Sequence, residues 1–109
     1  MPDDPRTGDL GRFAEPAMLV LVSLAGGAKH GYAIMTDVES FGGAAIGPGT
    51  LYAVLARLER RGLIEPLGPQ ERRRPYRLTM DGAAALDVQL QEMGRFVRAA
   101  RARQPGTAT

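Results

Sequence analysis

Residues 48–62 constrain the fold of this chain more than any other segment. Leu51, Leu55 and Leu58 recur at the spacing of one helix face, and the segment starts with a proline, which suits the first turn of a helix. Gly62 ends the pattern, and glycine is common just beyond a helix C-terminus. The spacing therefore predicts an amphipathic helix that begins at residue 48 and stops before Gly62.

Two short strand-like segments follow this helix. Residues 63–67 and 75–79 have the length and composition of strands. Residues 68–74 between them contain turn-forming residues and then three consecutive arginines. We therefore predict a two-stranded hairpin with a strongly basic tip.

Three further helices are expected. Residues 16–25 begin with a proline and precede two glycines; their periodicity also fits a buried strand, but their Ala, Met and Leu content favours a helix. Residues 30–40 carry an apolar stripe at helical spacing. A long final helix is expected over residues 81–103, capped by Thr79 or Asp81.

This order of elements is that of a winged helix-turn-helix, a mainly α (α+β) fold. Its third helix enters the major groove of DNA, and its hairpin, the β wing, contacts the backbone or minor groove. The 109 residues suffice for one such domain. We expect a flexible arm at 1–12, a DNA-binding domain at 13–80, a dimerisation helix at 81–103 and a disordered tail at 104–109.

The charge of the chain is unevenly distributed. Residues 1–56 carry three basic and six acidic side chains, whereas residues 57–109 carry eleven arginines and six acidic side chains. A GC-rich genome would explain the choice of Arg over Lys but not this clustering. A regional excess of arginine is expected of a surface that meets a polyanion.

Other classes of function are disfavoured by what the sequence lacks. It has no Cys, which excludes disulfides and thiolate metal sites. The apolar run at 17–24 is far shorter than the roughly 20 residues that cross a bilayer. Ser23 and Ser40 lack a nucleophile-elbow setting, and residues 47–50 lack the Lys of a phosphate loop. We expect no enzymatic activity, metal, cofactor or membrane association.

Three segments carry a resemblance to a known family. Residues 49–64, GTLYAVLARLERRGLI, resemble the GTLYxxLxRLExxGLI signature of the PadR-type transcriptional regulators. Residues 30–34, HGYAI, and 76–82, YRLTMDG, are similar to the family's HGYxI and YxLTxxG segments. The resemblance covers about residues 16–100. It implies a homodimeric DNA-binding repressor of the bacterial cytoplasm, associated with the nucleoid, and often responsive to a small molecule. The single final helix is similar to the compact branch of the family.

Two positions depart from the family pattern. Gly47 occurs where members often carry Ser, so the usual side-chain cap is missing, at a cost of only a few tenths of a kcal/mol. Phe96 is the only aromatic residue of the final helix, whereas some compact members stack planar drugs between aromatic side chains there. Drug binding by aromatic stacking is therefore not implied, and a small apolar effector stays open.

The expected DNA contacts lie on the third helix, the hairpin and the start of the second helix. Thr50 and Arg57 lie off the leucine stripe, and Tyr52 fits packing on the second helix as well as DNA contact. Glu59 is expected to pair with neighbouring arginines, and His30 suits a capping role better than a sensor. The hairpin arginines suit phosphate contacts. The full set is Lys29, His30, Gly49, Thr50, Tyr52, Arg57, Arg72, Arg73, Arg74, Tyr76 and Arg77.

The final helix carries an apolar stripe at helical spacing. It comprises Leu86, Leu90, Met93, Phe96 and Val97. We interpret it as core and as the interface of a homodimer; a ligand pocket between two such helices is the alternative. For the whole chain, the alternative is a winged-helix protein-interaction module whose basic face docks an acidic partner.

Overall fold

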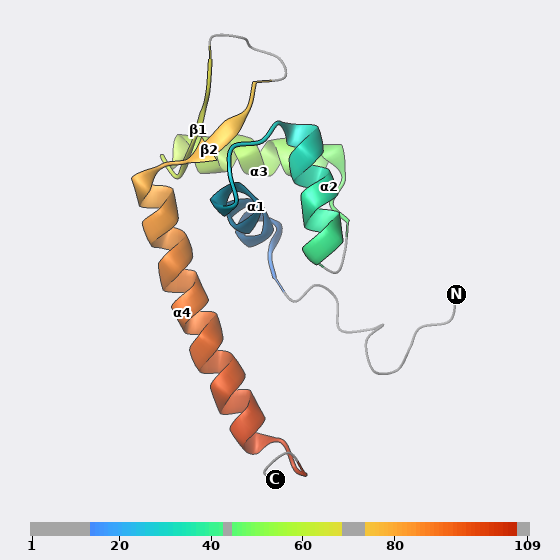
Figure 1. Cartoon of the computed structure of the whole chain (residues 1–109), viewed down its shortest axis with the longest axis vertical. Coiled ribbons are helices and arrows are strands. Elements are labelled where there is room, and N and C mark those ends of the chain that lie inside the picture. The colour runs from blue at the N-terminus through green and yellow to red at the C-terminus, as the bar shows by residue number, and fades with distance from the viewer. Residues whose placement is uncertain (1–13, 43–44, 69–73, 107–109) are drawn as a thin grey trace, which may run out of the picture.

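A computed structural model describes residues 14–42, 45–68 and 74–106 (Figure 1). The elements follow the predicted order. They are α1 (Pro16–Ala25), α2 (Gly31–Phe41), α3 (Pro48–Arg60), β1 (Ile64–Pro66), β2 (Tyr76–Leu78) and α4 (Met80–Arg103). The ambiguous run at 16–25 is a helix, as its composition indicated.

Helix α1 lies at the centre of the core. It packs against α2, α3, α4 and β2, and Figure 1 shows it between α2 and α4. Burial on several sides explains its nearly continuous apolar sequence, because a helix covered by neighbours needs no polar face. The buried hydrophobic residues are Leu19, Val20, Leu21, Leu24, Ile34, Val38, Ile46, Leu51, Val54, Leu55, Leu58, Ile64 and Leu86.

Helix α3 begins and ends as its sequence predicted. Leu51, Leu55 and Leu58 are buried, and Gly62 adopts a left-handed φ of 75°, which glycine adopts without strain. Gly47 is the N-cap residue and makes no side-chain cap bond. In α2, the expected start at His30 shifts by one residue, because His30 has extended backbone angles and serves as the N-cap.

The two strands pair antiparallel, with Ile64 opposite Leu78 and Pro66 opposite Tyr76. Both are shorter than predicted by one residue at each end, although the backbone bonds continue there: the Thr79 N–H donates to the Leu63 carbonyl (3.1 Å) and the Leu67 N–H to the Pro75 carbonyl (2.8 Å). The Leu63 N–H donates to the Leu58 carbonyl at the end of α3, and Thr79 caps α4. Lys29 adds an isolated antiparallel bridge to Tyr76, so the segment between α1 and α2 flanks the wing.

The start of α4 is fixed against the end of α3. Thr79 Oγ1 donates to the Gly62 carbonyl (2.6 Å) and accepts from the Gly82 N–H (3.0 Å). Gly82 packs so closely that a Cβ at this position would overlap the carbonyl oxygen of Leu63. We call this contact the α3–α4 junction.

Gly82→Ala is expected to lower stability by about 1–3 kcal/mol, because the added methyl group overlaps backbone that cannot move freely. For a domain of this size, this corresponds to a fall in Tm of roughly 5–20 °C, measured by circular dichroism. Gly49→Ala is the control, since a Cβ there meets nothing within 4 Å. A Gly82→Ala protein as stable as the Gly49→Ala protein would contradict the close packing at the junction.

Candidate nucleic-acid interface

Helix α3 presents one face to the core and the other to solvent. Opposite the buried leucines, Thr50, Tyr52 and Arg57 are exposed. Ala53 and Ala56 lie on this exposed face, and their small side chains would let a ligand approach the backbone closely. Sequence reasoning missed these two alanines, although their position off the leucine stripe marks the same face.

Tyr52 combines the two roles that the sequence left open. A Cβ at Gly31 would lie 2.6 Å from the Tyr52 hydroxyl oxygen, so the ring packs against the first residue of α2. Tyr52 is nevertheless 53% exposed. The ring is therefore held by α2 while much of it stays available to a partner.

A second exposed tyrosine lies beside it. Tyr32 is 76% exposed, and it lines a hollow of about 380 Å³ together with His30, Gly31 and Tyr52. The structure thus brings the predicted residues His30 and Tyr52 together across α2 and α3. Tyr32 was not among the predicted contacts, although its place off the Ile34–Val38 stripe could have indicated it.

Gly31→Ala is expected to weaken selective DNA binding about tenfold, similar to the loss of one good side-chain contact. The added methyl group would push the Tyr52 hydroxyl away from α2, and the ring with it. Fluorescence anisotropy with operator and shuffled duplexes measures the change, and Tyr52→Ala provides the reference. Unchanged discrimination in both variants would remove Tyr52 from the interface.

Lys29 has partners within the protein. Its ammonium group donates to the carbonyls of Ser23 and Gly27 and lies 3.8 Å from Asp37 Oδ2. Ser23, which is buried, donates to the same carboxylate oxygen (2.7 Å). These partners give Lys29 a structural role between α1 and α2, and a contact with DNA would compete with them.

The wing carries its described cations in pairs with carboxylates. Arg77 lies opposite Glu65 on the neighbouring strand, with 2.6 Å between Nε and Oε2. Arg74 reaches Glu59 of α3 (3.9 Å) and lies over the Tyr76 ring, 6.0 Å from its centroid. The pairing expected of Glu59 is therefore confirmed, and it joins the wing to α3. Arg72 and Arg73 lie outside the described residues.

The predicted dimer stripe divides into a buried and an exposed part. Leu86 is buried in the core, which agrees with the core part of its expected role. Met93 is half-buried, and Leu90, Phe96 and Val97 are 47%, 72% and 45% exposed. Figure 1 shows α4 extending well beyond the helices of the core, where these residues lie.

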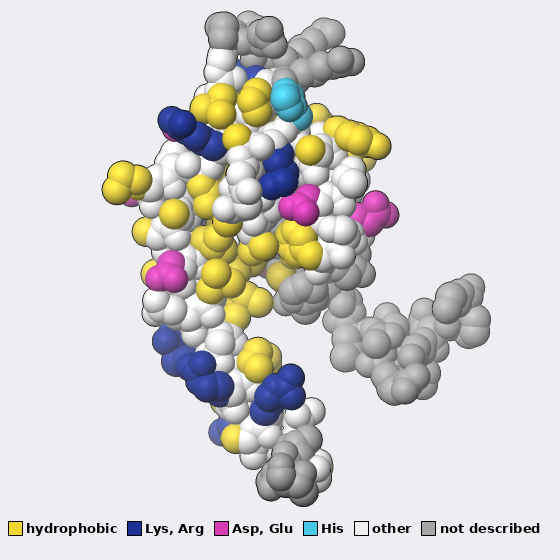
Figure 2. Space-filling model, in the orientation of Figure 1, with side chains coloured by type: hydrophobic (Ala, Val, Ile, Leu, Met, Phe, Trp, Pro, Cys, Tyr) yellow, Lys and Arg dark blue, Asp and Glu magenta, His cyan; other side chains and the backbone are white. Residues whose placement is uncertain are grey.

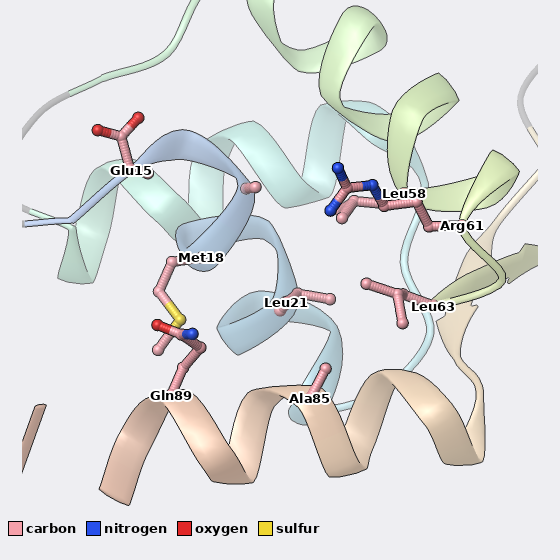
Figure 3. Close-up of a pocket in the computed structure, with 9 residues that line it drawn as sticks. Glu15, Met18, Leu21, Leu58, Arg61, Leu63, Ala85 and Gln89 are labelled. Atoms are coloured by element: carbon pink, nitrogen blue, oxygen red, sulfur yellow. The ribbon is translucent and has the colours of Figure 1, made fainter. Parts of the chain in front are cut away.

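A cavity of about 300 Å³ lies between α1, α3 and α4 (Figure 3). Its apolar lining includes Met18, Leu21, Leu58 and Leu63. Arg61 extends across it from the end of α3, and the remaining lining residues are Glu15, Ala17, Ala85 and Gln89.

These elements define the class of protein. Three helices with an exposed third helix, a two-stranded wing joined to it and a C-terminal helix make a winged helix-turn-helix of the kind found in transcription regulators. The chain belongs to the PadR-like family of transcriptional regulators, whose model matches residues 20–88. The resemblance carried by the sequence motifs is confirmed. The family is one of regulators, not of enzymes.

Individual relatives agree with this assignment. The chain is 44% identical over 85 residues to an uncharacterized 37.1 kDa protein in transposon TN4556 of Streptomyces fradiae. The match covers 78% of this chain and 25% of that protein. It is 33% identical over 78 residues to the transcriptional activator GvpE2 of Halobacterium salinarum, covering 72% of this chain and 39% of that protein. The chain therefore spans less than half the length of either relative.

A solved structure shares the fold. The PadR family transcription regulator of Clostridium difficile R20291 superimposes with a TM-score of 0.69 at 27% identity, covering 80% of this chain and 94% of that chain. Among the residues that the structure describes, no helix has both the length and the apolar character to cross a membrane.

Proposed function

We propose that this protein is a homodimeric, sequence-selective DNA-binding repressor that acts in the bacterial cytoplasm. The observation that carries the proposal is the surface formed by α3 and the wing. Exposed Thr50, Tyr52 and Arg57 lie on a helix that the Arg74–Glu59 pair joins to the wing. A helix of this size fits the major groove, and a neighbouring basic hairpin suits the backbone beside it.

The proposed division of the chain follows from this surface. Residues 13–80 bind DNA, with Thr50, Tyr52 and Arg57 contacting bases and the wing contacting phosphates. Residues 81–103 form the dimer and place two copies of α3 about one helical turn of DNA, roughly 34 Å, apart. The arm at 1–12 and the end of the tail at 107–109 lie outside the described residues.

The test is fluorescence anisotropy with the duplex directly upstream of the protein's own gene and a shuffled duplex, over a salt series. Selective binding with a steep salt dependence is expected, because phosphate contacts release counterions. Equally weak binding to both duplexes would place the operator elsewhere, and a selection from random duplexes would then identify it. Absence of binding even at low salt would favour the protein-interaction module.

Repression and activation are separated by a reporter driven from the bound promoter. Repression predicts that expression rises when the regulator is deleted. The relative GvpE2 is named as an activator, so falling expression on deletion would reverse the proposed sign while leaving DNA binding intact.

We further propose that a small, mainly apolar effector binds the cavity between α1, α3 and α4 (Figure 3). The leucine lining suits apolar groups, while Arg61 and Gln89 offer polar contacts. Because Arg61 follows α3, an occupant would bias the orientation of the recognition helix. The effector lowers DNA affinity only if it binds the DNA-incompetent state of the protein more tightly than the DNA-binding state.

A thermal-shift screen identifies compounds that bind, and anisotropy with operator DNA shows which of them regulate. Ala85→Leu is expected to fill part of the cavity and to abolish the effect of a hit while DNA affinity stays the same. A hit that acts equally on the Ala85→Leu protein binds elsewhere, and the exposed stripe of α4 is then the site to examine.

A further inference from the structure

A network of polar contacts joins the end of α1, the segment that follows it and α2. Asp37 of α2 accepts a hydrogen bond from Ser23 of α1 (2.7 Å), whose side chain is buried. The same carboxylate oxygen lies 3.8 Å from the ammonium group of Lys29. Figure 2 shows a basic and an acidic side chain close together below the only histidine of the chain. We call these three residues the Asp37 network.

The side chain of Lys29 closes a turn that the backbone alone leaves undefined. Gly27 in this turn adopts a φ of 137°, and a Cβ there would meet nothing within 4 Å. Glycine has wide conformational freedom, and packing does not restrict it at this position. The Lys29 ammonium group instead donates back to the carbonyls of Ser23 and Gly27. The conformation of the turn therefore depends on where Asp37 holds this ammonium group.

The backbone of Lys29 holds the wing. Its N–H donates to the Tyr76 carbonyl (3.0 Å), and the Tyr76 N–H donates to the Lys29 carbonyl (2.9 Å). A hairpin with three residues in each strand has little stability of its own, so this third segment is an important support. The Arg74 guanidinium lies over the Tyr76 ring. A shift of Lys29 would therefore move both the strand and the cation next to it.

The same segment supports the recognition helix. Gly31 follows Lys29 by two residues, and a Cβ at Gly31 would lie 2.6 Å from the Tyr52 hydroxyl oxygen of α3. The direct link between the wing and α3 is the Arg74–Glu59 pair, which is partly exposed and therefore weak. Residues 29–31 form a second link, because they contact the wing at one end and α3 at the other.

We propose that Asp37 is a positioning residue for DNA discrimination. By holding Lys29, it sets where the phosphate contacts of the wing lie relative to the base contacts of α3. Phosphate contacts fix the register of a protein on the duplex, and base contacts discriminate only in the correct register. Asp37 acts in this way without touching DNA. The proposal rests on the DNA-binding function proposed above and adds a residue that determines selectivity from within the protein.

Asp37→Asn separates positioning from packing. Asparagine has the same shape, and its amide oxygen still accepts from Ser23, but it no longer attracts the Lys29 ammonium group. The ratio of affinities for operator and shuffled duplexes is expected to fall about fivefold, an effect typical of networks that do not touch the ligand. Fluorescence anisotropy measures both affinities. Loss of a negative charge by itself would raise both affinities together and leave their ratio unchanged.

Three further variants serve as controls. Glu39→Gln removes the same charge from an exposed position of α2 and should keep the ratio. Asp37→Glu keeps a carboxylate near Lys29 and should keep most of the ratio. Ser23→Ala removes the buried hydrogen bond but leaves the ion pair. It should lower Tm in circular dichroism while the ratio stays the same.

Lys29→Gln breaks the same ion pair from its other side. It should lower the ratio about as much as Asp37→Asn, and the double variant should be no worse than either single variant, because both act through one contact. The slope of log K against log salt concentration should stay unchanged in all three proteins, since the number of phosphate contacts is the same.

The other outcomes overturn the proposal. An unchanged ratio in both Asp37→Asn and Lys29→Gln would show that the network only stabilises the fold. A ratio that also falls in Ser23→Ala would have the same meaning. A flatter salt slope in Lys29→Gln would indicate a direct phosphate contact instead. If the original protein does not discriminate between the duplexes, the proposed function itself fails, and this result is seen without any substitution.

Discussion

Leu90→Asp is expected to convert the proposed dimer into monomers and to lower operator affinity by two to four orders of magnitude. Leu90 is 47% exposed in the single subunit and lies on the stripe with Met93 and Val97. Covering it with a second copy would remove apolar surface from water, and a carboxylate there would be buried without a partner.

The fall in DNA affinity follows from the absence of bivalency. A dimer binds its second half-site as an intramolecular event, which raises affinity by about 10²–10⁴ over a single module. The monomer keeps its own α3 and wing, so binding to single half-sites should be almost unchanged. This combination separates a defect in assembly from a defect in the DNA-binding surface.

Light scattering gives the molar mass, and anisotropy with full and half operators gives the affinities. Val88→Asp is the matched control, because Val88 is also exposed on α4 but lies away from the stripe. It should remain a dimer. If Leu90→Asp remains a stable dimer as well, the seam between the copies lies outside α4.

Replacing Arg72, Arg73 and Arg74 together by Gln is expected to reduce affinity for all DNA sequences by two to three orders of magnitude at 0.1 M salt. Each phosphate contact contributes about 0.9 to the slope of log K against log salt concentration. Removing all three guanidinium groups should therefore flatten the slope by up to about 2.7. Discrimination between operator and shuffled duplexes should persist, because phosphate contacts carry little sequence information.

The contribution of Arg74 to DNA affinity depends on its partners within the protein. It pairs with Glu59 and lies over Tyr76, so DNA must compete with an ion pair at the surface, which is a weak interaction. Glu59→Gln should therefore raise DNA affinity slightly. Lys29→Gln is the control for the slope, since the Lys29 ammonium group has carbonyl and carboxylate partners within the protein.

An unchanged slope in the triple variant would remove the wing from the DNA interface. A lowered slope with loss of discrimination would show that the wing also positions α3. A changed slope for Lys29→Gln would restore Lys29 to the set of phosphate contacts.

The helices could be predicted because their signals are local. Prolines at residues 16 and 48, Thr79 as a cap and Gly62 as a stop act within one helical turn. The wing was placed correctly, but its strands were predicted too long. The error is one residue at each end, where the backbone bonds of Thr79 to Leu63 and of Leu67 to Pro75 continue beyond the regular strands.

The candidate site likewise contains residues that local sequence signals identify and residues whose roles depend on the fold. The exposed face of α3 follows from periodicity, so Thr50, Tyr52 and Arg57 could be named in advance. The role of Lys29 could not, because it depends on Asp37 and on carbonyls that the fold brings near its ammonium group. Leu86 fits an apolar stripe equally well inside the core or at an interface, and only the packing of α4 against the core decides between them.

The α3–α4 junction makes α4 a rigid arm for the recognition helix. Met93 lies fourteen residues from Thr79, about 21 Å along the helix axis. Turning α4 by about ten degrees about Met93 would move the junction by about 3.7 Å, slightly more than the rise of about 3.4 Å between base pairs. In the proposed dimer, the orientation of α4, far from any DNA contact, would then select operators by the spacing of their half-sites, and substitutions on α4 would change that spacing while α3 keeps its sequence.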